Sequence, residues 1–257
     1  MVTERFGCES REKARALIMA GLVYVNNQKA DKPGTLLSGN ETVELRGNTL
    51  AYVSRGGLKL EKAVELWGLS FCGNTCLDVG ASTGGFTDCM LQNGAKKVYA
   101  VDVGYGQLAW KLRTDPRVVN LERANFRYIT HRQVPEPVDF AGVDVSFISL
   151  EKILPVLARF LSDGGECVCL IKPQFEAGRE KVGKKGVVRD IDTHLEVLEK
   201  ILAFVRGLEL YPAGLTYSPI RGPEGNIEYL LYLKRCPASA DINPAEVAAQ
   251  SHLILNS

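Results

Sequence analysis

The sequence contains no apolar run of about 18 residues, the length needed to cross a bilayer, and it opens on a charged stretch rather than a secretion signal. These two absences argue against a membrane-spanning or secreted protein and predict a cytoplasmic one. An excess of one charge is also lacking, because the formal net charge of the 257 residues is only +1. Bulk charge therefore identifies no partner. With 46% hydrophobic and 24% charged residues, the composition is that of an ordinary globular protein.

Metal-binding patterns are missing as well. The three histidines, His131, His194 and His252, are widely separated and are expected at the surface. The seven cysteines are an odd number scattered through apolar segments, which suits a reducing compartment better than a disulfide framework. Cys167 and Cys169 alternate along an expected strand, so we interpret both as core thiols. No second Cys/His pair at zinc spacing accompanies them, and no metal site is expected.

Positive charge is nevertheless concentrated in two windows. Residues 107–132 and residues 172–189 each contain six Lys or Arg against two Asp or Glu, so each window has a net charge of +4. Such windows fit a phosphate-rich partner, although solvated loop faces explain them equally well. The Gly- and Lys-rich stretch 176–190 overlaps the second window, and we interpret it as a mobile substrate loop.

The chain divides into parts with different patterns. In residues 1–47 a helical pattern is followed by short apolar segments separated by turns, which predicts a small α+β module. Such a module is too small to bury much core alone. Residues 48–53 resemble a linker, residues 54–235 a larger domain, and residues 236–257 a peripheral tail.

Strand and helix patterns alternate in the larger domain, which predicts an α/β fold with a doubly wound, mostly parallel sheet. Only residues 219–225 separate the last two strands, so we expect the sheet to include an antiparallel final strand. The patterns predict strands at 75–79, 96–104, 117–123, 138–147, 164–173, 208–218 and 226–235, and helices at 56–67, 85–93, 150–161 and 192–206.

The stretch CLDVGASTGGFTDCML, residues 76–91, is the most informative part of the sequence. An apolar strand, a glycine-rich loop and a helix N-terminus together make a nucleotide-sized cradle at the carboxyl end of a strand. Glycines let a ligand approach the backbone. A carboxylate after the next strand can accept hydrogen bonds from a ribose diol. The predicted cofactor-binding residues are Asp78, Gly80, Ser82, Thr83, Gly84, Gly85, Phe86, Thr87, Asp102 and Asn125.

Two phosphate-binding motifs are absent from this loop. It reads G-x-x-x-G-G, whereas a dinucleotide-binding loop reads G-x-G-x-x-G and a P-loop places Lys and Ser or Thr after its last glycine. Their absence favours a nucleoside ligand without phosphates, and S-adenosylmethionine is the predicted cofactor. The same spacing disfavours a dehydrogenase, and a tight turn without a ligand is the alternative.

Charged residues are expected at the ends of several strands of the sheet. Lys172 follows four apolar strand residues in LIKPQFE, and Asp144 ends the preceding strand. Lys59 lies on the helix before the first strand, and Glu228 begins the last one. Any one of them could be a solvated ion pair. Together they form a candidate catalytic group, because substrates bind at the carboxyl ends of strands in open α/β sheets.

Five motifs carry a family resemblance: RGGLKLEKAVE, DVGASTGGFT, GVDVSFISL, LIKPQFEAG and GNIEYLLYLK. With them the chain resembles the TlyA (hemolysin A) family of FtsJ-like RNA 2′-O-methyltransferases over nearly its whole length. The resemblance implies a Rossmann-like class I methyltransferase fold, S-adenosylmethionine as cofactor, and cytidine riboses of ribosomal RNA in one or both subunits as substrate. It also implies that Lys59, Asp144, Lys172 and Glu228 match a catalytic Lys-Asp-Lys-Glu tetrad.

The N-terminal module resembles a small RNA-binding fold shared with a ribosomal protein and with pseudouridine synthases. The helix that usually opens this fold is mostly absent, so we expect an incomplete module. Basic residues of the module, of the start of the larger domain and of the substrate loop are the predicted RNA contacts: Arg11, Lys13, Arg15, Arg55, Lys181, Lys184 and Lys185.

The chemistry of ribose methylation fits these residues. A 2′-hydroxyl needs a base, and a lysine serves only if its pKa is lowered. The charge of Lys59 and partial desolvation are expected to lower the pKa of Lys172, because burial and like charge both disfavour an ammonium. Asp144 is expected to hold the amine in place, and Glu228 to orient Lys59.

Two other classes of function remain as alternatives. An RNA-binding or ribosome assembly factor could keep the fold without catalysis, although the full tetrad argues against it. A membrane-active cytolysin is disfavoured, because the chain shows no span, no secretion signal and no strongly amphipathic cationic helix. The sequence leaves the target nucleotide and the oligomeric state open.

Overall fold

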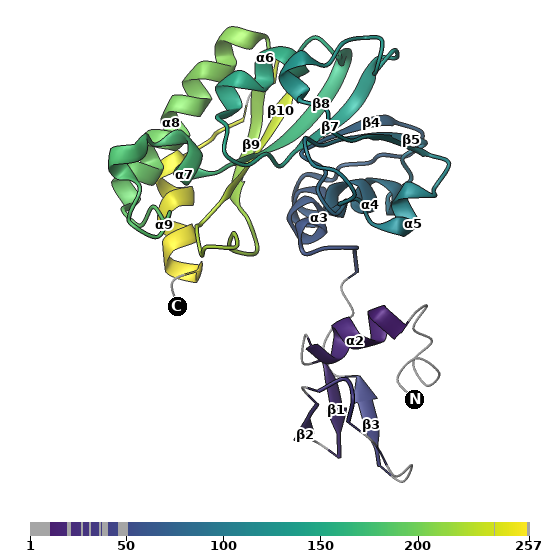
Figure 1. The fold of residues 1–257 in the computed structure, drawn as a ribbon. Helices are drawn as coiled ribbons and strands as arrows, with labels where there is room; N and C mark the ends of the chain where they lie inside the picture. The colour runs from purple at the N-terminus through teal and green to yellow at the C-terminus, as the bar shows by residue number, and fades with distance from the viewer. Residues whose placement is uncertain are drawn as a thin grey trace. The chain divides into compact units, whose positions relative to one another are not determined.

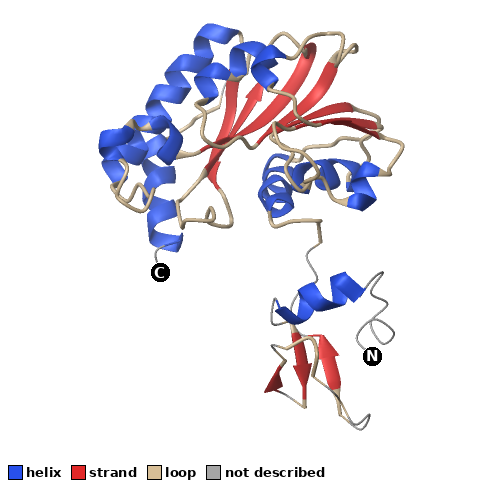
Figure 2. Cartoon of the chain, in the orientation of Figure 1, coloured by secondary structure: helices blue, strands red, loops and turns tan. Residues whose placement is uncertain are grey.

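The computed structural model describes residues 11–19, 22–26, 28–30, 32–35, 37, 41–45, 51–238 and 240–255. It divides the chain into two compact units, Met1–Ala51 and Tyr52–Ser257. Figures 1 and 2 show the elements of each unit.

Among its described residues, the first unit combines the helix α2 (Arg11–Met19) with a three-stranded antiparallel sheet in the order β2-β1-β3. Ala14, Val23 and Val43 are buried, so the helix and two of the strands share a small apolar core. The predicted loss of an opening helix concerns residues that precede Arg11, which lie outside the described residues. The strands are β1 (Val23–Val25), β2 (Gln28–Lys29) and β3 (Val43–Leu45).

The second unit contains a seven-stranded sheet in the order β6-β5-β4-β7-β8-β10-β9 (Figures 1 and 2). Strands β4 to β8 pair in parallel, and β10 runs antiparallel to both of its neighbours. The predicted doubly wound, mostly parallel sheet with an antiparallel final strand is confirmed. The strands are β4 (Thr75–Val79), β5 (Lys97–Val101), β6 (Val118–Leu121), β7 (Val138–Val143), β8 (Leu161–Ile171), β9 (Tyr211–Tyr217) and β10 (Tyr229–Lys234).

Helices cover both faces of this sheet (Figure 1). Because successive strand residues point to opposite faces, β8 contributes Cys167, Cys169 and Ile171 to one core and Val168 and Leu170 to the other. One face carries α3 (Gly56–Trp67), α4 (Gly85–Gln92) and α5 (Trp110–Arg113). The other carries α6 (Leu154–Leu157), α8 (Ile191–Val205) and α9 (Pro244–Leu255).

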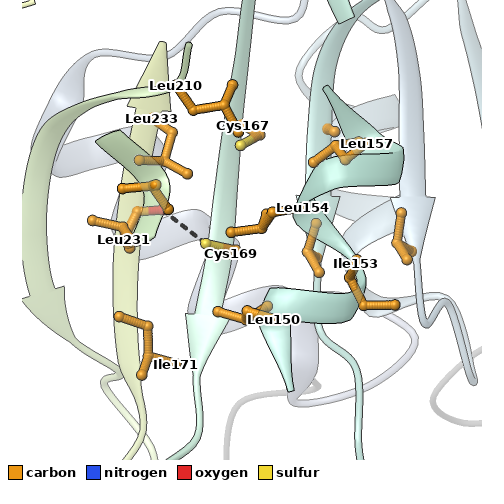
Figure 3. Packing of buried hydrophobic residues seen from close by; sticks show 14 of the residues in the cluster. Leu150, Ile153, Leu154, Leu157, Cys167, Cys169, Ile171, Leu210, Leu231 and Leu233 are labelled. Carbon is orange, nitrogen blue, oxygen red and sulfur yellow. Dashed lines mark hydrogen bonds between the residues drawn. The ribbon is translucent and has the colours of Figure 1, made fainter. Parts of the chain in front are cut away.

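The larger core is shown in part in Figure 3, where Leu154 and Leu157 of α6 lie against β8. Cys167 and Cys169 are fully buried there, as the sequence predicts. The Cys169 thiol donates a hydrogen bond to the Leu231 carbonyl at 3.7 Å, and burial raises the pKa of Cys167 to about 12. Both are therefore inert core residues.

The helix predicted over residues 150–161 is wrong as a continuous element. The segment forms a 3-10 turn at Leu150–Lys152, then the four-residue helix α6, and turns into β8 at Leu161. Pro155 has no N–H to donate to the preceding turn. Leu150, Leu154 and Phe160 are all buried in this interrupted segment.

The tail predicted to be peripheral instead ends in α9, which packs on α8 and β9. Ser251 is buried, and its hydroxyl hydrogen-bonds the Tyr229 hydroxyl at 3.0 Å.

His194, predicted at the surface, is buried as well: its Nδ1 lies 2.7 Å from the Tyr229 hydroxyl and 3.3 Å from Nε2 of His252. Burial lowers the pKa of His194 to about 4. The sequence hides this contact because α9 buries small residues, Ala248 and Ser251.

Two adjacent substitutions test whether α9 is part of the core. Ala248 is 1% exposed and Ala249 is exposed, so Ala248→Glu introduces a carboxyl into the core whereas Ala249→Glu points into solvent. We expect Ala248→Glu to lower the free energy of unfolding by about 3 kcal/mol, and Ala249→Glu to change it by less than about 0.5 kcal/mol. Urea titration followed by circular dichroism measures both, and equal effects would show that α9 is not packed.

Candidate functional site

The strand order of the sheet creates a site at the carboxyl ends of β4, β7 and β8. The chain adds β5 and β6 on one side of β4 and then β7 and β8 on the other, which makes this edge a topological switch point. A cavity of about 320 Å³ lies there. It is lined by the start of α3, the loop between β4 and α4, residues after β7 and β8, and the loop before β10.

The glycine-rich loop after β4 is packed so closely that side chains do not fit. Gly80 has φ +87° and Gly84 has φ +98°, a region of backbone conformation that favours glycine. A Cβ on Gly80 would lie 2.5 Å from the Asp144 carbonyl oxygen, and one on Gly85 would lie 2.5 Å from Ser54 Oγ. The loop is therefore held against both α3 and the end of β7, and its backbone faces the cavity.

Six of the ten predicted cofactor-binding residues line the cavity. They are Asp78, Gly80, Ser82, Thr83, Gly85 and Phe86. The other four, Gly84, Thr87, Asp102 and Asn125, are not among its lining residues.

Polar members of those four make contacts within the protein. Asp102 accepts hydrogen bonds from the backbone N–H groups of Ser82 at 2.7 Å and Gly104 at 2.6 Å, so its carboxylate shapes the neighbouring loops. Asn125 Oδ1 accepts from the N–H of Arg127 at 3.1 Å and caps a short 3-10 turn.

Asp78 is a fully buried carboxyl group at the floor of the glycine loop. Its Oδ2 accepts from the Thr87 N–H at 2.9 Å and from the Thr87 hydroxyl at 2.6 Å. Its Oδ1 has no hydrogen-bond partner among the described residues. Burial raises the pKa of Asp78 to about 7. A buried acceptor without a donor fits a ligand that brings one, and the glycine loop leaves room for that ligand.

Lys59, Asp144, Lys172 and Glu228 meet at the same edge, although they are far apart in the sequence. Lys59 Nζ lies 3.1 Å from Asp144 Oδ2 and 2.7 Å from Glu228 Oε2, and Lys172 Nζ lies 2.6 Å from Asp144 Oδ1. Lys59 and Lys172 are each 7% exposed, and Glu228 is 1% exposed. We call these four residues the charge cluster. Each amine of the cluster contacts at least one carboxylate.

The charge cluster shifts the pKa values of Lys59 and Asp144. Burial alone would lower the pKa of Lys59, but the carboxylates of Asp144 and Glu228 outweigh burial and raise it. Burial alone would raise the pKa of Asp144, but Lys59 and Lys172 outweigh burial and lower it. Lys59 therefore keeps its proton beside two carboxylates, and the loss of a proton expected of Lys172 stays a prediction.

Two further residues hold the loops of the charge cluster, and the sequence analysis missed both. The Ser146 hydroxyl accepts a hydrogen bond from Lys172 Nζ at 3.1 Å. Glu176, at the end of α7 (Pro173–Glu176), accepts from the Ser149 hydroxyl at 2.6 Å and the Leu150 N–H at 2.8 Å. Glu176 thus ties the segment after β8 to the segment after β7. Its position four residues after Lys172 in LIKPQFE was the available signal.

An aromatic pair lies beside the charge cluster. Phe147 is 91% exposed and has a φ of +64°, an unusual conformation for a residue with a side chain. Its ring centroid lies 5.1 Å from that of Phe175, which in turn lies 6.0 Å from Lys172 Nζ. Backbone strain that exposes a large aromatic ring beside buried charges is characteristic of a binding surface.

The predicted RNA contacts lie in both units. Arg11, Arg15, Arg55, Lys184 and Lys185 are exposed, and Arg55 also lines the cavity. The side chain of Lys13 lies outside the described residues.

Some basic residues of the two windows are ion-paired. Lys181 pairs with Glu196, Arg113 pairs with Glu122, and the Arg117 guanidinium lies 2.7 Å from Asp115. The free positive charge of each window is therefore smaller than its count of basic residues suggests.

Other kinds of site were sought in the part of the chain that the structure describes. Within it, no group of three or more His, Cys, Asp or Glu is arranged to hold a metal ion. Within the same residues, no helix combines the length and hydropathy required to cross a bilayer.

The balance of the charge cluster can be tested by removing Lys59. Lys59→Met leaves Glu228 buried without its partner, so we expect the free energy of unfolding to fall by about 3 to 5 kcal/mol. The double variant Lys59→Met/Glu228→Gln should recover part of the loss, because it removes the unpaired charge. Urea unfolding measures each variant, with Lys96→Met at an exposed site as control. Equal stability of the single and double variants would contradict a charge-balanced cluster.

Known proteins resemble this chain over most of its length. A family model described as FtsJ-like methyltransferase matches residues 52–235, and an S4 domain model matches residues 2–43. A Bacillus subtilis (strain 168) protein named "Putative rRNA methyltransferase YqxC" is 54% identical over 234 residues, which cover 91% of this chain and 83% of the relative. The 16S/23S rRNA (cytidine-2′-O)-methyltransferase TlyA of Mycobacterium tuberculosis (strain ATCC 25618 / H37Rv) is 44% identical over 226 residues, or 88% of this chain and 84% of the relative.

A solved structure shows the same relationship. The structure named "Putative hemolysin from Streptococcus thermophilus" is 50% identical to this chain, covers 96% of it and 92% of its own chain, and superposes with a TM-score of 0.80. The family model covers well over half of the sequence, and this chain belongs to the FtsJ-like methyltransferase family.

Proposed function

We propose that this protein transfers a methyl group from S-adenosylmethionine to a ribose 2′-hydroxyl of ribosomal RNA, with cytidine as the preferred nucleoside. The charge cluster beside the glycine loop is the observation that carries the proposal. It places two amines and two carboxylates next to a cofactor-sized cavity. The names of the relatives, which describe rRNA methyltransferases and a cytidine-2′-O-methyltransferase, support the same reaction.

S-adenosylmethionine is the cofactor of this family, and the residues present fit it. The glycine loop brings bare backbone to the cavity, and Asp78 Oδ1 can accept a hydrogen bond from a donor group of the cofactor. Gly80, Ser82, Thr83, Gly85 and Phe86 would line its binding site. When bound, the cofactor supplies a sulfonium-activated methyl group. The protein therefore has to align the acceptor oxygen and remove its proton.

Lys172, starting as the neutral amine, is the proposed base that takes the proton of the 2′-hydroxyl on its Nζ atom. Asp144 lies 2.6 Å from that atom and would hold the amine in place. Lys59, paired with Asp144 and with Glu228 at 2.7 Å, would supply a fixed positive charge beside the reacting oxygen. Such a charge stabilises an oxyanion as it forms.

The substrate of the proposed reaction is RNA. The exposed Phe147 ring offers a base a stacking partner next to Lys172. Arg55, which lines the cavity, and the exposed lysines of the substrate loop would contact phosphates. Residues 1–47, with Arg11 and Arg15 exposed on α2, would form a small RNA-binding domain, residues 48–53 a linker, residues 54–235 the methyltransferase domain and residues 236–257 a C-terminal extension of that domain.

The role of Lys172 has a direct test. Lys172→Ala should abolish transfer of labelled methyl groups from S-adenosylmethionine to purified ribosomal RNA and ribosomal subunits, because the 2′-hydroxyl loses its base. The affinity for S-adenosylmethionine, measured by calorimetry, should change by less than about twofold, since the glycine loop is untouched. Lys96→Ala at an exposed site is the matched control.

Two results would contradict this role. Equal loss of cofactor affinity in Lys172→Ala would make Lys172 a cofactor ligand rather than a base. A wild-type protein that binds the cofactor and RNA but transfers no methyl group would favour an RNA-binding assembly factor.

The raised pKa of Asp78 predicts that cofactor binding depends on pH. Its folded pKa of about 7 lies above the ordinary value, so the carboxyl is mostly protonated below pH 7 in the free protein. A cationic cofactor favours the carboxylate, so binding should release a proton and weaken about tenfold between pH 8 and pH 6. Calorimetry in buffers of different ionisation enthalpy measures both effects. Asp78→Asn should remove the proton release, and an unchanged pH profile in that variant would exclude Asp78 as its source.

A further inference from the structure

The substrate loop contains a closed turn that presents two lysines to solvent. The Gly183 N–H donates to the Val187 carbonyl at 3.1 Å, and the Gly186 N–H donates to the Gly183 carbonyl at 2.8 Å. Gly186 has a φ of +73°, which a residue with a side chain rarely adopts. Lys184 and Lys185 lie at the tip and are exposed. In the described part of the chain neither forms an ion pair, so both charges are available to a ligand.

A single buried amide holds this turn in place. Asn226 is 2% exposed and lies in the loop before β10. Its Oδ1 accepts a hydrogen bond from the Val188 N–H at 3.0 Å, and its Nδ2 donates to the Gly186 carbonyl at 2.9 Å. The Val188 carbonyl lies 3.1 Å from Nε2 of the buried His194. The backbone that follows the two lysines is therefore held by Asn226, at Gly186 and Val188, and by His194, at Val188.

The same asparagine connects the turn to the candidate active site. Its backbone carbonyl accepts from the Gly222 N–H at 3.0 Å. Gly222 and Pro223 line the cavity, and a Cβ on Gly222 would lie 2.6 Å from Glu228 Oε1. Glu228 itself follows Asn226 by two residues. Asn226 thus joins the lysine turn, through its side chain, to the loop that borders the cavity and the charge cluster, through its backbone carbonyl.

We propose that Asn226 is a positioning residue that holds the Lys184–Lys185 turn as a preformed phosphate-binding element for the RNA substrate. The inference rests on the proposed function, because it assigns the turn to the same RNA. Lysine side chains on a loose loop lose conformational entropy when the loop becomes ordered on binding. A turn that is already fixed loses less. The two ammonium groups at the tip are complementary in charge to RNA phosphates, and their contacts would be sensitive to salt.

The test compares four full-length variants with the wild type: Asn226→Ala, Asn226→Asp, Lys184→Ala/Lys185→Ala, and Asn226→Ala combined with both lysine changes. RNA affinity is measured with transcribed 16S and 23S ribosomal RNA over a range of salt, without cofactor. Hydrogen exchange of the Val188 amide reports whether its hydrogen bond to Asn226 is broken. Thermal unfolding and S-adenosylmethionine affinity report whether the fold and the cofactor site are intact.

Loss of two phosphate contacts should reduce the slope of log affinity against log salt by about 1.4 in the double lysine variant. We expect Asn226→Ala to expose the Val188 amide to exchange and to reduce the slope by a similar amount. Its RNA affinity should fall about tenfold, or about 1.4 kcal/mol. The combined variant should be no weaker than the double lysine variant, because Asn226 acts through the turn. Asn226→Asp should also weaken binding, since its carboxylate faces the Gly186 carbonyl.

Matched controls separate this effect from general damage. Asn93→Ala removes an amide that donates to the Cys89 carbonyl at 2.8 Å, far along the chain from the turn, and Lys96→Ala removes an exposed charge before β5. Neither should change the salt slope. Cofactor affinity should stay within about twofold in every variant.

Three results would overturn the inference. In the first, Asn226→Ala opens the Val188 amide but keeps the wild-type salt slope. In the second, the Val188 amide stays protected. In the third, the losses from Asn226 and the two lysines add. Failure of the proposed function is distinguishable from failure of this inference. A wild type that binds RNA through this turn but transfers no methyl group contradicts the reaction and leaves the role of Asn226 intact.

Discussion

Two amines and two carboxylates meet at one edge of the sheet, where Lys59, Lys172 and Glu228 are almost without solvent and Asp144 is partly buried. Each amine there has to contact a carboxylate. This requirement fixes the relative positions of several elements of the second unit. Lys59 comes from α3, Asp144 follows β7, Lys172 follows β8 and Glu228 precedes β10, so four separate elements must be held within hydrogen-bond distance. Because each amine contacts a carboxylate, the four groups can be buried together, and the amines stay fixed beside the cavity.

The supporting contacts around the charge cluster follow from that constraint. Glu176 ties the segment after β8 to the segment after β7. The glycine loop fits only because Gly80 and Gly85 have no side chains to meet Asp144 and Ser54. Packing against the cluster and room for a cofactor therefore require the same residues. This explains how one loop serves both the fold and the binding site.

The sequence was sufficient for much of this account, because its signals are local. Strand alternation predicted the parallel sheet. Asp144 and Lys172 were predicted because they follow apolar strands, whereas Lys59 on a helix and Glu228 at the start of a strand were matched to the tetrad by motif. Contacts between distant segments were not predictable. The pairing of His194 with His252, the small buried face of α9 and the hydrogen bonds of Glu176 and Asn226 depend on tertiary packing. The raised pKa of Lys59 depends on tertiary packing as well, since only the structure shows two carboxylates beside it.

The central claim is that the charge cluster prepares a ribose oxygen, rather than a base, to accept the methyl group. The most direct measurement incubates the wild-type protein with S-adenosylmethionine carrying a labelled methyl group and ribosomal RNA, digests the RNA to nucleosides and identifies the labelled product by mass spectrometry. The account predicts label in a 2′-O-methylated nucleoside, with 2′-O-methylcytidine as the product. Label in a base-methylated nucleoside would contradict it.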